Sequence, residues 1–345
     1  MEDVRNIFVT GGAGFIGSAF VRLVLGELPG CRVLNFDALT YAGNLDNLRG
    51  VADERHRFVR GDICDPAAVL AALDEGTDFL VNFAAESHVD RSIHSAAEFV
   101  RTNVLGTQVL LDAARERGVR RFVQVSTDEV MGSLPDRDDA YFTEASPFEP
   151  NSPYSASKAA AEHLCRAAHH THGLDVVTTR CGNNYGPRQF PEKFLPLLLA
   201  NASRDEAVPV YGDGRNVRDW IYVEDHCRAV LAAALRGRAG GVYNIGARNE
   251  RRNIEVAESV LDLLGKPRAL LKFVKDRPGH DRRYAIDPSK AERELGWRPR
   301  ETWESGLGKT VRWYAENADW VGRARSGAYR DYYRKQYGGE AGGGR

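Results

Sequence analysis

The sequence has no long hydrophobic runs and no excess of charge of either sign. No apolar run reaches the roughly 18 residues that a membrane-spanning helix needs, and the N-terminus lacks a signal-peptide pattern. The formal net charge of −1 gives no electrostatic reason to expect nucleic acid or an anionic membrane as a partner. We therefore expect a protein that binds neither.

Cysteine pairs are also missing. The five cysteines are odd in number and contain no C-x-x-C pair, which is typical of reduced thiols in a cytoplasmic protein. His169, His170 and His172 lie close together, but no Cys or carboxylate accompanies them at metal-ligand spacing. We interpret these histidines as the end of a helix and expect no metal site.

A glycine-rich turn near the N-terminus has the sequence context of a dinucleotide-binding site. The β-rich run 6–10 leads into the turn G-G-A-G-F-I-G, and a helical stretch follows. Gly11, Gly14 and Gly17 let the backbone approach a pyrophosphate, which the helix N-terminus attracts. A second strand ends at Asp37, where a carboxylate can accept hydrogen bonds from the adenosine ribose and repels a 2′-phosphate. The pattern predicts NAD rather than NADP.

The rest of the chain predicts an α/β fold. At 345 residues with 43% hydrophobic content, it can bury a full core as one large domain or two unequal lobes. Strand-like and helix-like runs alternate in the first half, which predicts a Rossmann-type doubly wound parallel sheet with helices on both faces. Residues 1–189 would mainly form this NAD-binding domain and 190–335 a smaller mixed α/β substrate-binding lobe, with some elements returning to the first domain and a disordered tail at 336–345.

Tyr154 and Lys158 lie four residues apart, on one face of a predicted helix. An ammonium at this spacing can lower the pKa of the phenol and bind the nicotinamide ribose. After a dinucleotide fingerprint, such a pair is typical of a site that removes a hydroxyl proton while hydride leaves the same carbon. Thr127, at the end of a preceding strand, can hydrogen-bond the same hydroxyl.

Asp128 and Glu129 follow that strand directly. Adjacent carboxylates are often solvated loop residues, but ligands of open α/β sheets bind beyond the carboxyl ends of strands, so we expect this pair at the nucleotide crevice. When C4 of a hexose is oxidised to a ketone, the C5 proton becomes acidic. Glu129 can then remove that proton while a protonated Asp128 donates to the departing C6 hydroxyl. Hydride returned to C6 would complete a reaction with no net redox change.

Several specific motifs extend over residues 5–335. They are T-G-G-A-G-F-I-G at 10–17, D-A-L-T-Y-A-G-N at 37–44, A-A-E-S-H-V-D-R-S-I at 84–93, S-T-D-E-V at 126–130, N-N-Y-G-P at 183–187, R-D-W-I-Y-V-E-D-H at 218–226 and D-R-P-G-H-D-R-R-Y-A-I-D at 276–287. On these motifs the chain resembles the extended short-chain dehydrogenase/reductases, and within them the dTDP-glucose 4,6-dehydratases. The resemblance implies a hydro-lyase that uses NAD to convert dTDP-glucose to dTDP-4-keto-6-deoxy-glucose.

The resemblance also implies roles for individual residues. Asp128, Glu129 and Tyr154 would be acid, base and redox tyrosine, beside Thr127 and Lys158. The NAD site would be lined by Phe15, Ile16, Asp37, Ala38, Leu39, Thr40, Asp62, Ile63, Ala84, Ala85, Thr102, Lys158 and Asn184, in addition to the three glycines. Substrate contacts would come from Ser87, Thr127, Asn183, Lys193, Pro209, Tyr211, Arg218, Asn253, Arg277 and His280. Arg218 suits a diphosphate clamp, because a guanidinium binds phosphate oxygens bidentately.

One position departs from the family pattern. Members usually carry Tyr after the D-E-V triplet, where this chain has Met131. Because Met is flexible and apolar, we hypothesise that Met131 widens the pocket near the crevice and alters sugar tolerance.

Other assignments stay open. A nucleotide-sugar 4-epimerase or a uronate decarboxylase would use the same NAD site and Tyr/Lys pair, but neither needs an adjacent acid and base. A non-enzymatic NAD sensor would keep the glycine turn and have no use for Tyr154 or Lys158. The family implies a homodimer, and the apolar helical runs 99–114 and 157–168 could supply a four-helix interface or simply cover the sheet.

Overall fold

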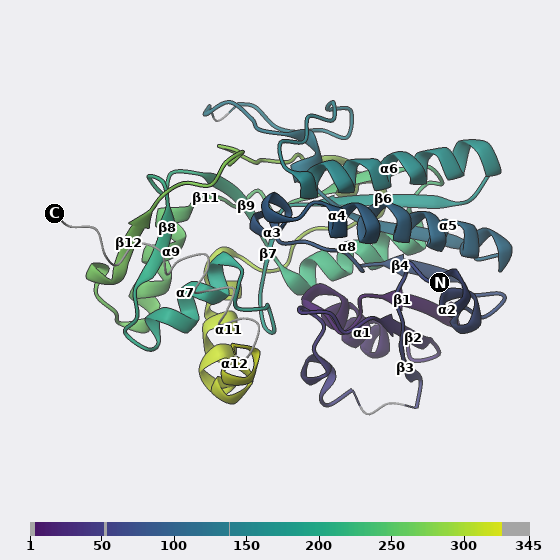
Figure 1. The fold of residues 1–345 in the computed structure, drawn as a ribbon, viewed down its shortest axis with the longest axis horizontal. Coiled ribbons are helices and arrows are strands. Elements are labelled where there is room, and N and C mark those ends of the chain that lie inside the picture. Colours follow the sequence, from purple (N-terminus) through teal and green to yellow (C-terminus); the bar gives the residue numbers. More distant parts are fainter. Residues whose placement is uncertain (1–3, 52–53, 138, 326–345) are drawn as a thin grey trace.

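A parallel sheet forms the centre of the molecule (Figure 1). The computed structural model describes residues 4–51, 54–137 and 139–325, so the predicted tail at 336–345 lies outside the described residues. Within these ranges the largest sheet has seven strands in the order β10-β6-β5-β4-β1-β2-β3, all paired in parallel. The strands are β1 (Asn6–Thr10), β2 (Arg32–Asp37), β3 (His56–Arg60), β4 (Phe79–Asn82), β5 (Arg121–Thr127), β6 (Val176–Cys181) and β10 (Val242–Ile245). This order confirms the predicted doubly wound α/β fold.

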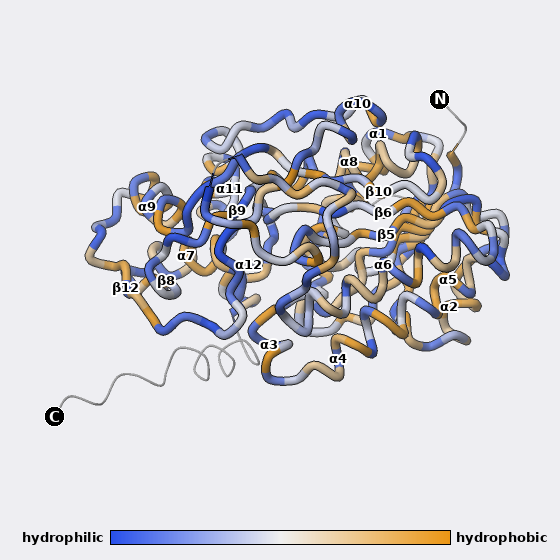
Figure 2. Tube along the Cα trace, turned by 90° about the horizontal axis from the view of Figure 1, so that it is seen from above, coloured by the Kyte–Doolittle hydropathy of each residue, from blue (hydrophilic) through white to orange (hydrophobic). Residues whose placement is uncertain are grey.

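Helices cover both faces of the sheet, because its strands are apolar on both sides. The helices form two groups, one on each face of the sheet. Ile7 and Val9 of β1 pack in a buried cluster with the first group, whereas Phe8 packs in another cluster with the second group. Hydrophobic residues are concentrated along the strands in Figure 2. The first group comprises α1 (Phe15–Glu27) and α8 (Val223–Arg236), and the second comprises α2 (Pro66–Ala72), α5 (Gly106–Glu116) and α6 (Pro153–His172).

A smaller lobe follows the sheet at its carboxyl edge. A mixed three-stranded sheet of β7 (Asn183–Tyr185), β9 (Val217–Tyr222) and β11 (Glu250–Arg252) lies beside a parallel pair, β8 (Val208–Tyr211) and β12 (Leu271–Val274). Tyr185, Trp220 and Trp303 form the aromatic centre of its core. The lobe's helices are α7 (Phe194–Ala202), α9 (Asn253–Leu264), α11 (Trp303–Glu316) and α12 (Ala318–Ala324), and α10 (Ser289–Leu295) packs on α8.

Short segments complete the described chain. α3 (Val89–His94), α4 (Ala97–Phe99) and the π-helical turn η2 (Val100–Leu105) lead into α5. Three 3₁₀ turns, η1 (Leu45–Leu48), η3 (Asp128–Met131) and η4 (Arg268–Leu270), occur elsewhere.

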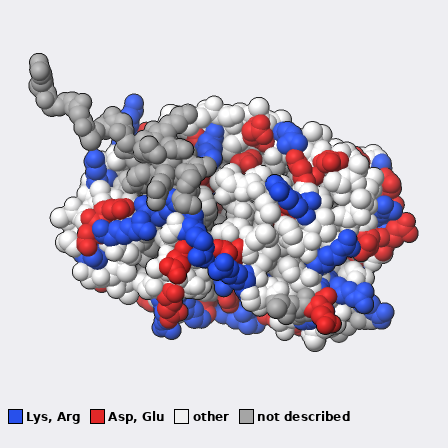
Figure 3. Space-filling view, turned by 60° about the horizontal axis from the view of Figure 1, so that its bottom comes forward, with Lys and Arg blue, Asp and Glu red and all other residues white. Residues whose placement is uncertain are grey.

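Local signals explain where α6 begins and ends. Ser152 and Ser155 form a reciprocal capping box, Pro153 occupies the first turn, and Gly173 ends the helix with a φ of 68°. The prediction that His169 to His172 form a helix end is confirmed. None of the helices in the described part of the chain is long and apolar enough to cross a membrane. Acidic and basic side chains lie interspersed on the face shown in Figure 3.

Candidate active site

A long cleft follows the carboxyl ends of the sheet's strands. It encloses about 1780 Å³ of space, including its open mouth. Parallel strands bring the residues that follow them to one edge, which is where ligands of open α/β sheets bind. The predicted residues that line the cleft are Gly11, Gly14, Phe15, Ile16, Gly17, Asp37, Ala38, Thr40, Asp62, Ile63, Ala84, Ala85, Ser87, Thr102, Thr127, Asp128, Glu129, Tyr154, Lys158, Asn183, Asn184 and Lys193.

The glycine turn at one end of the cleft leaves no room for side chains. A Cβ atom on Gly17 would lie 2.2 Å from the Gly11 carbonyl oxygen, and one on Gly11 would lie 2.6 Å from the Ala84 nitrogen. The N-cap of α1 is Gly14, which has no side chain to bond the N–H groups of the first turn, and this turn contains no acidic residue. The free N–H groups of this turn therefore fit a pyrophosphate.

Asp37 connects the glycine turn to the loop after β2. Its Oδ2 accepts a hydrogen bond from the Ala13 N–H (2.9 Å) and its Oδ1 accepts one from the Leu39 N–H (2.8 Å). Burial raises the pKa of Asp37, although both N–H groups act against the rise. The carboxylate lines the cleft and keeps further lone pairs for ribose hydroxyls. Leu39 does not line the cleft; it adopts a φ of 55° at the start of this loop.

Asp62 occupies the same end of the cleft, beyond β3. Burial opposes its ionisation, but the Cys64 N–H and the Arg101 guanidinium, which lies 2.7 Å from Oδ2, lower the pKa of Asp62. Arg101 and Thr102 reach the cleft from the π-helical turn η2. This end is therefore suited to the adenosine part of a dinucleotide.

The predicted acid lies in the middle of the cleft. Thr127 caps the turn η3, accepting a hydrogen bond from the Glu129 N–H, and its hydroxyl donates to Asp128 Oδ1 at 3.3 Å. Asp128 is 1% exposed, and its Oδ2 has no hydrogen-bond partner among the described residues. Burial, together with the carboxylates of Glu129 and Asp219, raises the pKa of Asp128 well above its usual value. These surroundings favour a protonated Asp128.

Glu129 has a different electrostatic environment. Burial raises its pKa as well, but the cationic groups of Arg277, Lys193 and Arg218 act against the rise. Adjacent carboxyl groups with such different surroundings can divide acid and base roles between them. The predicted division between Asp128 and Glu129 is thus chemically reasonable.

Tyr154 and Lys158 line the cleft one turn apart on α6, but their electrostatics differ from the expectation. Burial, followed by the Glu129 carboxylate, raises the pKa of Tyr154 well above its usual value. The Lys158 ammonium donates to the Val125 carbonyl oxygen at 2.7 Å, and burial lowers the pKa of Lys158. The net shift in the pKa of the phenol is therefore upward, and the role of Lys158 in lowering it stays a prediction.

The other end of the cleft is rich in charge. Lys193 Nζ donates to the Ser87 carbonyl oxygen at 2.6 Å, and both residues line the cleft. Arg218 is 4% exposed; its guanidinium donates to the Asp281 carbonyl oxygen at 2.9 Å and lies 4.2 Å from the Tyr284 ring centroid. A buried guanidinium held in this way can present its remaining donors to a phosphate.

Six predicted substrate residues do not line this cleft. Asp90 links two of them, because it accepts hydrogen bonds from the Tyr211 hydroxyl (3.1 Å) and the Arg277 guanidinium (3.3 Å). His280 contacts the Tyr211 ring edge-on. The six residues absent from the cleft lining are Pro209, Tyr211, Arg218, Asn253, Arg277 and His280.

Met131 lies away from the cleft. It is 1% exposed and packs in an apolar cluster with Phe142 and Tyr284, and its sulfur lies 3.5 Å from Arg180 Nη1. The expectation that Met131 borders the crevice is wrong, because burial in this cluster removes the side chain from the cleft wall.

Sequence reasoning missed several residues at the cleft. Glu86 and Glu192 line it, and Glu192 accepts hydrogen bonds from Arg91 Nε (3.2 Å) and Nη2 (3.0 Å). Glu86 stands within the quoted A-A-E-S-H motif, whereas the sequence around Glu192 carries no such signal. Phe190 also lines the cleft, in contact with Tyr41.

Known proteins resemble this chain over nearly its full length. The family model described as GDP-mannose 4,6 dehydratase matches residues 8–310. A dTDP-glucose 4,6-dehydratase of Xanthomonas campestris pv. campestris (strain B100) is 53% identical, over 93% of this chain and 96% of the relative. The crystal structure of a dTDP-glucose 4,6-dehydratase from Streptomyces venezuelae, with NAD and TYD bound, matches with 51% identity and a TM-score of 0.90, over 92% of this chain and 99% of that one. A Thermus thermophilus UDP-glucose 4-epimerase complex with NAD has 32% identity and a TM-score of 0.83, over 90% and 99%.

Proposed function

This chain belongs to the family described as GDP-mannose 4,6 dehydratase. Within that family we propose that it is an NAD-dependent hydro-lyase that converts dTDP-glucose to dTDP-4-keto-6-deoxy-glucose. Relatives that are about half identical over nearly the whole chain carry the name of this activity. The crevice with its glycine turn and Asp37 supports NAD as the cofactor.

One observation carries the proposal. Asp128 and Glu129 are adjacent in the cleft that also contains Tyr154 and Lys158, and their surroundings differ: Asp128 is buried beside other carboxyl groups, whereas Glu129 faces cations. Removal of water across C5 and C6 needs one proton acceptor and one proton donor at neighbouring carbons. This pair supplies both.

The chain's residues divide the reaction between them. The chemistry that NAD supplies when bound is the removal of hydride from C4 and its return at C6. Tyr154 takes the proton of the C4 hydroxyl, and Thr127 hydrogen-bonds the same hydroxyl. Because burial raises the pKa of Tyr154, the phenolate needs a stabilising cation. Lys158, one turn along α6, is the nearby cation that can stabilise the phenolate.

Elimination then falls to the carboxyl pair. A carbonyl at C4 acidifies the C5 proton, and Glu129 removes it as the general base. Asp128, whose protonated form burial favours, donates a proton to the departing C6 hydroxyl, which leaves as water. When C6 then receives hydride, Glu129 returns its proton to C5. Three cations act on Glu129 at this end: Lys193, which lines the cleft, and Arg218 and Arg277, which lie outside its lining. Their positive charge suits the diphosphate of the substrate.

Incubation of the purified protein with dTDP-glucose tests the proposal. We expect a product with a C6 methyl group and a carbonyl at C4, identified by NMR. Conversion to the C4 epimer with C6 unchanged would instead support a 4-epimerase, the alternative that the similarity to the Thermus thermophilus enzyme keeps open. Parallel assays with GDP-mannose and UDP-glucose determine the preferred base and sugar. Tight NAD binding without turnover of any nucleotide sugar would favour a sensor.

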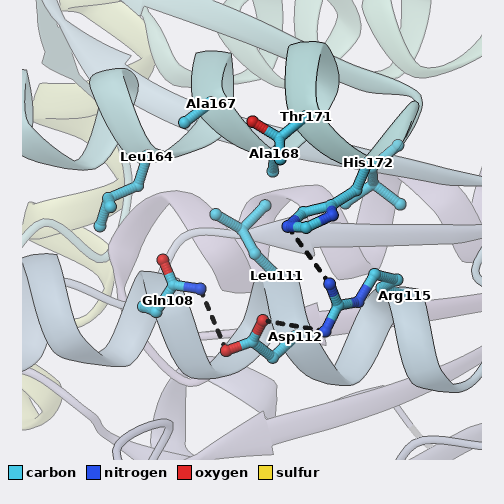
Figure 4. Close-up of a pocket in the computed structure, with 10 residues that line it drawn as sticks. Gln108, Leu111, Asp112, Arg115, Leu164, Ala167, Ala168, Thr171 and His172 are labelled. Atoms are coloured by element: carbon cyan, nitrogen blue, oxygen red, sulfur yellow. Dashed lines mark hydrogen bonds and ion pairs between the residues drawn. The ribbon is translucent and has the colours of Figure 1, made fainter.

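We further propose a homodimer formed through the outer surface of η2, α5 and α6. Val100 and Leu105 on this surface are 54% and 51% exposed, an unusual state for large apolar side chains. Figure 4 shows a groove between α5 and α6 with Leu111 in its middle, Leu164 toward one end and the hydrogen-bonded Arg115 and His172 at the other. Sedimentation of the native protein as a dimer, and of L105R as a monomer, is the expected result; a monomeric native protein would contradict this arrangement.

The remaining assignments are also proposals. We assign NAD binding mainly to residues 1–189 and sugar-nucleotide binding mainly to 190–335, with β10 (Val242–Ile245) as an element that returns to the large sheet. A cytoplasmic location is supported by the five cysteines, all of which are free thiols.

A further inference from the structure

The loop after β2 reaches from the cofactor end of the cleft to the sugar end. It starts at Asp37, whose carboxylate holds the N–H groups of Ala13 and Leu39. A Cβ atom on Gly43 would lie 2.8 Å from Asp37 Oδ1, so the returning part of the loop packs against the same carboxylate. Thr40, Ala42 and Gly43 line the cleft. The conformation of this loop is thereby tied to the residue that we assign to the adenosine ribose.

Tyr41, at the tip of this loop, contacts segments from the opposite side of the cleft. The Arg91 guanidinium carbon lies 4.0 Å from the centroid of its ring, and the Phe190 ring meets it edge-on at 6.1 Å. Burial raises the pKa of its hydroxyl, which interacts with the side chains of Glu86 and Ser87. One side chain of the cofactor loop thus meets two segments, 86–91 and the one around Phe190, that lie 45 or more positions further along the chain.

Those segments carry the proposed sugar-nucleotide contacts. Arg91, stacked on Tyr41, makes a two-pronged ion pair with Glu192. Lys193, the next residue, donates to the Ser87 carbonyl oxygen at 2.6 Å and is one of the cations that act on Glu129. Contacts therefore connect Tyr41 to Glu192 through Arg91, and the neighbouring Lys193 acts electrostatically on the proposed base.

We propose, on the basis of the proposed function, that Tyr41 couples the binding of the two ligands of the cleft. A bound thymidine diphosphate stabilises the Ser87–Lys193 and Arg91–Glu192 contacts. These contacts in turn keep the Tyr41 loop closed over NAD. In this proposal the cofactor leaves when the loop moves, so occupancy of the sugar end slows cofactor release. Coupling between two sites requires an element that both ligands bias, and the Tyr41 loop contacts both ends of the cleft.

Cofactor release from the full-length protein tests the inference. The protein is saturated with NADH and chased with excess NAD, and release is followed by the loss of NADH fluorescence with and without saturating dTDP. In the native protein we expect dTDP to slow release by about tenfold, within the usual range of coupling between sites. In Tyr41→Ala, release without dTDP should be faster and dTDP should slow it little.

Two variants serve as controls. Tyr41→Phe keeps the ring against Arg91 and Phe190 and should retain most of the effect of dTDP. Tyr141 is another tyrosine beside an arginine, with Arg283 5.6 Å from its ring, but it is 47% exposed. Tyr141→Ala should therefore behave like the native protein.

The outcomes separate this inference from the proposed function. If dTDP slows release equally in the native protein and in Tyr41→Ala, or has no effect in the native protein although both ligands bind, the coupling role of Tyr41 is wrong and the dehydratase proposal stands. If the native protein binds neither NADH nor dTDP, the proposed function fails and this inference fails with it.

Discussion

The two ends of the cleft bind by different physical means. The cofactor end is formed largely by backbone: glycines without room for a Cβ atom and the free N–H groups of α1. Two carboxylates complete it, Asp37 held by two N–H groups and Asp62 paired with Arg101. The sugar end is lined by charged side chains, among them Lys193, Glu192 and Glu129, and the buried Arg218 acts electrostatically on Glu129. The shape of the backbone therefore limits which ligand the cofactor end binds, whereas the charges at the sugar end determine which proton transfers it can catalyse. Substitutions at the sugar end should affect chemistry, and those at the cofactor end should affect binding.

The largest effect is expected from Glu129→Gln. The amide keeps the size of the side chain but cannot accept the C5 proton, so kcat should fall by about 10³-fold, within the range for loss of a general base. NAD binding should persist, because the cofactor end is unchanged. Product formation and C5 proton exchange in D₂O, both followed by NMR, measure the loss. Glu149→Gln, at an exposed carboxylate, is the control; normal product formation by Glu129→Gln would refute the assignment of the base.

Asp128→Asn should lower kcat by about 10²-fold and change the pH profile. Glu129 must be ionised to act as the base, so the rate should fall as the pH drops through the pKa of Glu129. Because burial raises that pKa, the fall should lie above the usual glutamate range. Asp128 must keep its proton, so the rate also falls as the pH rises through its raised pKa. Asparagine cannot ionise, so the alkaline fall that belongs to Asp128 should disappear while C5 exchange continues. An alkaline limb identical to that of the native enzyme would contradict the role of Asp128 as acid.

Arg218→Lys should weaken substrate binding more than turnover. The guanidinium is fixed by backbone oxygens and by the Tyr284 ring, and an ammonium cannot reproduce its planar fork. We expect KM for dTDP-glucose to rise about tenfold with little change in kcat. Steady-state kinetics and calorimetric titration with dTDP measure this, and unchanged dTDP affinity would remove Arg218 from the phosphate site.

The smallest effect is expected from Asp37→Asn at the cofactor end. Asparagine keeps one acceptor oxygen but loses the charge, so NAD affinity should fall by about fivefold and the preference for NAD over NADP should narrow. At saturating NAD, kcat should equal that of the native enzyme. Loss of turnover by this variant at saturating cofactor would contradict the claim that the cofactor end affects binding rather than chemistry.

The sequence predicted the cofactor end better than the sugar end, for a physical reason. Strand periodicity and the glycine turn are local patterns, so the parallel sheet and the position of Asp37 followed from short segments. Polar residues directly after strands, such as Asp62 and Asp128, reach the cleft because parallel strands end at one edge.

Contacts between distant segments were not predictable in this way. The burial that raises the pKa of Tyr154 and the Lys158 hydrogen bond to Val125 both depend on how α6 packs on the sheet. Burial of Met131 beside Arg180 depends on a cluster that joins residues 130–148 to residues 284–286. The contacts of Tyr41 with Arg91 and Phe190 likewise join separate segments.

Transfer of hydrogen from C4 to C6 within one sugar tests the central claim most directly. We predict that dTDP-glucose carrying deuterium at C4, incubated in ordinary water, gives a product with deuterium in its C6 methyl group. A product without deuterium at C6, or one that retains it at C4, would contradict the account.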